Sequence, residues 1–183
     1  MTANTKNLIV TAFFSLAEDK PLDKITIKDV VEACGITRQT FYYHFQDILD
    51  VIEWTLKQHS QRMIEKTLTA KTTREAFRII LSTLEDESAI IAHLIRSRKR
   101  EQVEQLLLSA IKSYFAALIS NQTMRSALAL DELETMLNFY SYAMIGVLLE
   151  NNGKKNVDLD RLAEQLDKLA RGEYFSKLLE GMS

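Results

Sequence analysis

The sequence is poor in the two residues that most often interrupt regular structure. Its 183 residues include one proline and five glycines. No stretch shows the sustained alternation of apolar and polar side chains that a half-buried β-strand requires, whereas apolar residues recur at helical spacing along the chain. The sequence therefore predicts an all-α fold and argues against a sheet protein.

Cysteine is almost absent. Cys34 is the only one, so a disulfide within one chain is excluded and a reducing cytoplasm is the expected location. Cys34 shares a helix face with Val30 and Val31, which favours a position in the core. A redox-sensing thiol is the weaker alternative.

Long apolar runs and catalytic signatures are also lacking. No run approaches the roughly 20 residues that cross a bilayer, so we expect no membrane association. The sequence has no glycine-rich phosphate loop and no Ser-His-Asp arrangement in a recognisable context. We therefore expect neither an enzyme nor a bound cofactor.

Metal ligands are scarce as well, with three histidines in the whole chain. His44 and Cys34 lie in the segment that is described next as a helix-turn-helix pattern. This leaves His59 and His93, which with a glutamate could form an incomplete zinc site. These two lack the spacing of a ligand pair. We expect no metal site, with zinc sensing as the weaker alternative.

The sequence does contain a helix-turn-helix pattern. Thr26 can cap a helix over residues 27–34, and the carboxylate of Asp29 can return to the cap, as in a capping box. Gly35 then supplies the left-handed backbone conformation that a sharp turn between helices needs. Thr37 is placed to cap a second helix.

The second helix has aromatic rings on one side and polar groups on the other. Phe41 and Phe45 are four residues apart, so both face inward. Arg and Gln side chains can fork to purine edges, while hydroxyl groups and helix N-termini suit phosphate oxygens. The pattern predicts double-stranded DNA as the partner. The residues expected to contact it are Thr26, Lys28, Thr37, Arg38, Gln39, Thr40, Tyr42, Tyr43 and His44.

This segment resembles the TetR family of bacterial transcription factors. The family pattern runs Gly, aliphatic, Ser/Thr, two variable residues, Thr/Ser, aromatic or Leu, Tyr, any residue, His/Tyr, Phe. The matching residues are Gly35, Thr37, Thr40, Tyr42, His44 and Phe45. The resemblance covers about residues 5–57, and residues 40–54 are similar to a branch that includes regulators of dihydroxyacetone kinase operons.

The resemblance implies a homodimer that reads a pseudo-palindromic operator and is switched by a small-molecule effector. It divides the chain into a helix-turn-helix domain over residues 1–47 and a helical effector-binding and dimerisation domain over residues 48–183. Effector chemistry, target genes and the sign of regulation stay open.

Two features depart from this expectation. Most family members carry a phosphate-binding Lys where this chain has Ile48, and residues 1–47 hold five basic residues against six acidic ones. We therefore expect a shallow salt dependence of DNA binding. The alternative function is a ligand-dependent protein partner of another regulator that does not itself bind DNA.

The remaining sequence predicts a helical body. Expected helices cover about residues 48–68, 72–84, 88–95, 101–120, 131–150 and 159 onward. The last two are strongly apolar for the edge of a single subunit, which favours dimerisation through them, with an internal core as the alternative. The expected interface residues are Leu133, Met136, Tyr140, Met144, Val147, Leu162 and Leu166.

Aromatic and histidine side chains of the body are candidates for the effector pocket that the family resemblance implies. They are Trp54, His59, His93, Tyr114, Phe139 and Tyr142. Each alone is more often ordinary packing. A basic cluster of Arg96, Arg98, Lys99 and Arg100 is expected to be a solvated bend, with a phosphorylated effector or the DNA backbone as alternatives.

Overall fold

The computed structural model describes residues 2–86, 97–120, 129–151, 154 and 156–180, and this part of the chain is helical with no β-strand. The predicted all-α fold is confirmed. The elements are α1 (Thr2–Asp19), the 3-10 helix η1 (Leu22–Lys24), α2 (Ile27–Cys34), α3 (Arg38–His44), α4 (Ile48–Thr67), α5 (Thr73–Asp86), α7 (Arg100–Ser120), α8 (Leu130–Asn151), α9 (Leu159–Ala170) and α10 (Glu173–Glu180).

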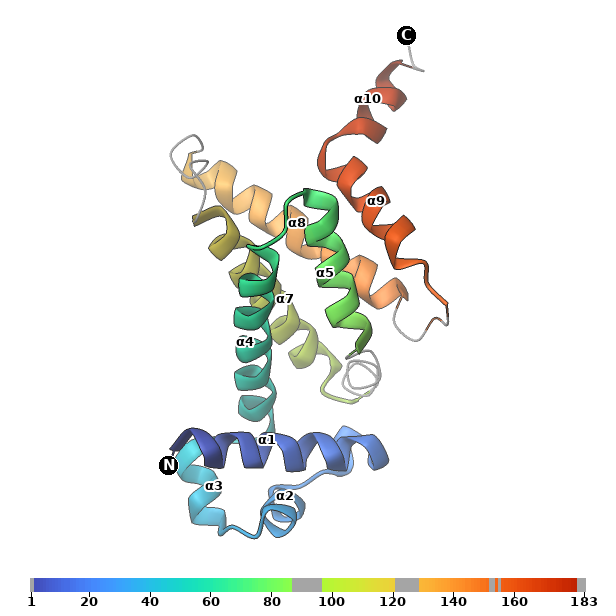
Figure 1. Cartoon of the computed structure of the whole chain (residues 1–183). Helices are drawn as coiled ribbons and strands as arrows, with labels where there is room; N and C mark the ends of the chain where they lie inside the picture. The colour runs from blue at the N-terminus through green and yellow to red at the C-terminus, as the bar shows by residue number, and fades with distance from the viewer. Residues whose placement is uncertain (1, 87–96, 121–128, 152–153, 155, 181–183) are drawn as a thin grey trace.

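The three N-terminal helices form a small module at one end of the molecule. Helix α1 lies across the base of α4, with α2 and α3 on its other side (Figure 1). Ile9, Phe13 and Ala17 follow one another at i, i+4 and i+8 on α1, and all three are buried. They belong to one hydrophobic cluster with Phe41 and Phe45.

The boundaries of α2 follow from the sequence as predicted. The Oδ2 atom of Asp29 accepts hydrogen bonds from the backbone N–H of Thr26 at 2.8 Å and from its hydroxyl at 2.7 Å, while the Asp29 N–H donates to Thr26 Oγ1 at 3.2 Å. Gly35 ends the helix with a φ of 66°, in the left-handed region. The capping box and the glycine turn are both confirmed.

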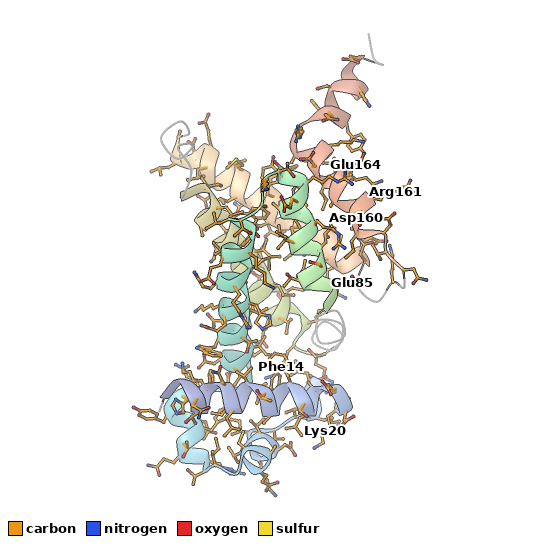
Figure 2. The ribbon with its side chains drawn as sticks, in the orientation of Figure 1. Phe14, Lys20, Glu85, Asp160, Arg161 and Glu164 are labelled. Carbon is orange, nitrogen blue, oxygen red and sulfur yellow. The ribbon has the colours of Figure 1, made fainter. Side chains whose placement is uncertain are left out.

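The body is built on α4 and α7, which pack along each other, with α8 against α7 and α9 against α5. One apolar cluster gathers around Ile80, Tyr114 and Met144, and another around Leu81 and Leu166. Two ion pairs reinforce the contact between α5 and α9, from Arg78 Nε to Asp160 at 3.1 Å and from Arg74 to Glu164 at 3.9 Å. Figure 2 shows Asp160 and Glu164 on α9.

The N-terminal module is joined to the body at two places. Helix α4 continues the chain from α3, and the beginning of α7 packs into the module's own core through Val103 and Leu107. The carboxylate of Asp23 in η1 also accepts the backbone N–H of Arg98 at 3.0 and 3.1 Å. The predicted domain boundary after residue 47 stays a prediction. The apolar core of the N-terminal module includes residues on both sides of this boundary.

Other details differ from the expectation or lie outside it. The predicted helix over residues 88–95 falls outside the described residues, as does Arg96 of the basic cluster. Arg98 precedes α7, and Arg100 is the first residue of α7, where it pairs with Glu104 at 2.6 Å. The helix predicted from the leucines at 159, 162, 166 and 169 is α9, and a further helix, α10, follows it after Gly172, which adopts a φ of 73°. No helix in the described portion has both the length and the apolar character needed to cross a membrane.

The capping box of α2 predicts a pH dependence of stability. Hydrogen bonds from Thr26 and then the Lys20 ammonium lower the pKa of Asp29 from 3.8 to about 2. The ionised cap therefore stabilises the fold above pH 4, and this contribution is lost as the pH falls through about 2. Asp29→Ala should be less stable than the wild type at pH 6, with the difference shrinking between pH 4 and pH 2 in urea unfolding.

The control for this measurement is Asp19→Ala, which removes an exposed carboxylate outside the capping box. A difference between the wild type and Asp29→Ala that stays constant from pH 6 to pH 2 would contradict the assignment.

Candidate DNA-recognition site

Helix α3 is positioned by a cap at its start and by two rings beneath it. Thr37 has an extended backbone and its Oγ1 accepts the N–H of Thr40 at 3.1 Å, so the predicted N-cap is confirmed. The two threonine hydroxyls are 2.9 Å apart. Phe41 is 0% exposed and Phe45 is 2% exposed, as expected for inward-facing rings. Together these contacts leave the opposite side of α3 open to solvent.

The exposed side of α3 carries the side chains expected to read DNA. Arg38 and Gln39 are exposed, and neither makes an ion pair or a side-chain hydrogen bond with the described residues. Tyr42 is 58% exposed and Tyr43 is 77% exposed, so both rings are in contact with solvent. His44 is half-buried and meets the Tyr43 ring edge-on, with centroids 5.0 Å apart.

The two predicted contacts in the α2 region are already engaged within the chain. The hydroxyl of Thr26 donates to Asp29, so a phosphate contact by this group would compete with the helix cap. Lys28 pairs with Glu32 at 3.7 Å across an exposed helix turn. An exposed pair of this kind is weak, so Lys28 can exchange its glutamate partner for a phosphate.

The positive charge of the module is largely committed internally. Lys20 pairs with Asp29 at 3.1 Å, Lys28 pairs with Glu32, and the Lys6 ammonium lies over aromatic rings. Among the described residues, this leaves Lys24 and Arg38 as the cations of residues 1–47 without an ion pair or ring contact. The local electrostatics therefore agree with a shallow dependence of DNA affinity on salt.

Position 48 is an apolar core position in this protein. The Ile48 side chain is buried in the cluster that also contains Phe45 and Ile52. The helix start itself is capped by Asp47, whose carboxylate accepts the N–H of Asp50 at 3.0 Å. Ile48 therefore helps to hold α4 on the module and offers no group to a phosphate.

The candidate effector residues do not come together at one place. A groove of about 280 Å³ lies between α4 and α7, and Tyr114 is the predicted pocket residue that lines it. Its other lining residues are both apolar and polar: Glu53, Leu56, Lys57, Ser60, Gln61, Ile64, Leu106, Ser109, Ala110, Ser113 and Ala117. Lys57 pairs with Glu53 at 2.8 Å.

The other predicted pocket residues lie elsewhere. Trp54 packs against Phe45, with ring centroids 6.1 Å apart, and belongs to the core of the N-terminal module. His59 is half-buried on α4, and His93 lies outside the described residues. Phe139 and Tyr142 are 68% and 61% exposed on α8, away from the groove.

Tyr114 closes the groove with its ring and not with its hydroxyl. The Tyr114 hydroxyl donates to Thr67 Oγ1 at 2.9 Å, and Thr67 in turn donates to the Met63 carbonyl at 2.7 Å. Burial raises the pKa of Tyr114 to about 12, partly offset by the hydrogen bond to Thr67. The phenol therefore stays neutral at ordinary pH, and a molecule in the groove would meet its aromatic surface.

The predicted dimer residues lie mainly in or beside the subunit core. Met144 and Leu166 are buried, and Val147 and Leu162 pack against the cluster between α5 and α9. Leu133, Met136 and Tyr140 are half-buried. The exposed apolar stripe of α8 runs instead through Phe139, Tyr142, Ala143 and Gly146, and a Cβ added at Gly146 would meet open space.

The surroundings of Cys34 and the grouping of possible metal ligands bear on the two weaker alternatives, a redox-sensing thiol and a zinc site. The Cys34 thiol is half-buried, its sulfur lies 3.6 Å from the Leu8 carbonyl oxygen, and burial raises its pKa. A raised pKa disfavours the reactive thiolate, so the structure supports a packing role. Within the described residues, no three His, Cys, Asp or Glu side chains converge as metal ligands.

Comparison with protein families gives two matches. Residues 9–53 match the profile of bacterial regulatory proteins of the tetR family, and residues 71–172 match that of a transcriptional regulator C-terminal region of the same family. No curated protein sequence matches the chain.

Several solved structures share the fold. A Listeria innocua protein, Lin0861, has a TM-score of 0.71 and 20% identity, over 90% of both chains. The dihydroxyacetone kinase operon activator DhaS has a TM-score of 0.65 and 18% identity, over 92% of this chain and 95% of its own. The TetR family repressor AlkX from Dietzia has a TM-score of 0.55 and 17% identity, over 93% of this chain and 97% of its own.

The exposed guanidinium of Arg38 generates a prediction. Arg38→Ala should weaken binding to a cognate DNA duplex by ~1–3 kcal/mol and relax the preference at one base position, if the side chain forks to a guanine. Fluorescence anisotropy with single-base variants of the duplex measures both effects. Arg161→Ala, which removes an exposed arginine on α9, is the matched control. Equal affinities of the wild type and Arg38→Ala for the duplex would contradict the base contact assigned to Arg38.

Proposed function

The chain belongs to the TetR family of bacterial transcriptional regulators, and from this we propose that it binds a pseudo-palindromic operator as a homodimer and responds to a small-molecule effector. The observation that carries the proposal is the exposed side of α3. There Arg38 and Gln39 make no ion pair or side-chain hydrogen bond with the part of the chain that the structure describes, and they lie beside two exposed tyrosines on a helix whose position is fixed by its cap and buried rings.

The proposed contacts divide into two kinds. Arg38 and Gln39 lie in the first turn of α3, where side chains of a recognition helix reach base edges in the major groove. The hydroxyls of Tyr42 and Tyr43, together with the N–H groups at the start of α3, suit phosphate oxygens and would fix the register. With little free positive charge, specific contacts must supply most of the affinity.

The exposed stripe of α8 supports dimerisation. Phe139 and Tyr142 expose apolar rings to solvent, and Ala143 and Gly146 beside them allow close approach of a second helix. Pairing this stripe with its copy across a two-fold axis would bury the rings and set the separation of the two recognition helices. We propose this stripe as the centre of the interface, in place of the buried residues expected from the sequence.

The groove between α4 and α7 is the proposed effector site. A molecule in it would contact both helices that connect the body to the DNA-reading module. Differential affinity for two arrangements of these helices would shift the population between operator-binding and operator-releasing dimers. DhaS is described as an activator and AlkX as a repressor, so their names support neither sign of regulation for this chain.

The alternative function, a protein partner that does not bind DNA, has two supporting observations. Most cations of the N-terminal module are engaged within the chain, and Ile48 is buried. The exposed Arg38 and Gln39, which have no side-chain partner among the described residues, favour the operator reader.

Selection of bound duplexes from a random pool by the purified protein, at low and moderate salt, tests the proposal. We expect an inverted repeat to be enriched at both salt concentrations, because a two-fold dimer presents two recognition helices. No enrichment at either concentration would refute the operator-binding proposal and favour the protein partner.

The α8 stripe gives a separate prediction. Replacing Phe139 and Tyr142 together by Ser should convert the wild-type dimer to a monomer at micromolar concentration, since both rings would lose their burial in the interface. Analytical ultracentrifugation measures the change. Tyr43→Ser removes a more exposed ring from the opposite module and should stay dimeric. A double variant that remains dimeric shows that the interface lies elsewhere.

A further inference from the structure

Lys6 occupies an unusual position for an N-terminal lysine of a DNA-reading module. Its ammonium nitrogen lies 5.1 Å from the centre of the Phe45 ring and 5.6 Å from the centre of the Trp54 ring. Both distances are within the range of cation–aromatic attraction. The side chain is half-buried and makes no ion pair with the described residues. Three elements therefore meet at this ammonium: α1, the end of α3 and α4.

The two rings under Lys6 connect the recognition helix to the body. Phe45 is the C-cap residue that follows α3, and its ring lies 6.1 Å from that of Phe41, on the side of α3 opposite the exposed side chains. On its other side, Phe45 meets Trp54 of α4 at 6.1 Å and an interplanar angle of 77°. A continuous row of rings thus runs from α4 to the interior face of α3.

The short link between the two helices makes this row mechanically important. Between the end of α3 at His44 and the start of α4 at Ile48, the backbone is extended at Phe45 and at Asp47. The link is held to the start of α4 by the N–H of Gln46, which donates to Asp50 Oδ2 at 2.9 Å, and the ring contact between Phe45 and Trp54 adds to what fixes the angle between the two helices. The ammonium of Lys6 is attracted to both rings at once and favours one arrangement of Phe45 relative to Trp54.

We propose that Lys6 is a positioning residue for DNA recognition, which sets the angle of α3 relative to α4 through the rings of Phe45 and Trp54 and does not bind a phosphate. This role rests on the proposed operator-binding function. It also assigns Trp54 a place in the coupling between body and module, away from the effector groove.

The test compares Lys6→Gln and Lys6→Arg with the wild type on the operator obtained by selection. Lys6→Gln should weaken binding about threefold to tenfold, and Lys6→Arg should restore it, because a guanidinium also stacks on aromatic rings. The slope of log affinity against log salt should be the same for all three proteins. A phosphate contact would instead contribute about 0.9 to the slope, and Lys6→Gln would lose it.

Trp54 is the only tryptophan, so its fluorescence reports on the cluster directly. Lys6→Gln should shift its emission and Lys6→Arg should restore it, whereas Lys24→Gln, which removes an exposed cation of the same module, should not. Unchanged operator affinity, an unchanged emission spectrum or a lowered salt slope in Lys6→Gln would each overturn the role. If the wild type selects no duplex, the operator-binding function is refuted. If the wild type binds its operator and the Lys6 variants bind it with the same affinity, this inference alone is refuted.

Discussion

Burial of Phe41 and Phe45 is the constraint on which the exposed surface of α3 depends. Helix α3 has seven residues, too few to be stable in water by hydrogen bonding alone. Its conformation and position come from these two rings, which are buried against α1 and the start of α4. The buried rings therefore determine where the solvent-facing side chains of α3 lie. A change in the core beneath α3 alters its exposed surface.

The same core also reaches into the body. Val103 and Leu107 place the beginning of α7 in contact with the N-terminal module, and Asp23 holds the backbone of Arg98 just ahead of α7. The N-terminal module thus packs on α4 and α7, the two helices that border the groove. A molecule that separates these helices would change the packing of the module at both contacts. The orientation of the module would then depend on whether the groove is occupied, without a long relay of residues.

The N-terminal features could be predicted because each depends on residues close in sequence. The capping box at Thr26, the left-handed Gly35, the Thr37 cap and the inward rings all follow from spacing within about four residues. The environment of Trp54 and the outward stripe of α8 could not be predicted in this way. Periodicity identifies an apolar face of a helix, but α8 is apolar on several faces, and only tertiary packing decides which is covered. The leucine spacing predicted α9 but ends at Leu169, so it gave no signal for α10 beyond Gly172.

The internal engagement of the module's cations has a consequence for how such a protein searches a genome. Non-specific attachment to DNA depends almost entirely on neutralising phosphates, and a module with few available cations stays on random sequence only briefly. For the proposed operator binding, sliding distances would then be short, and the operator would be found mainly by repeated encounters from solution. Non-specific DNA, although present in large excess, would also sequester little of the protein. Even a small number of molecules would then remain available to bind the operator.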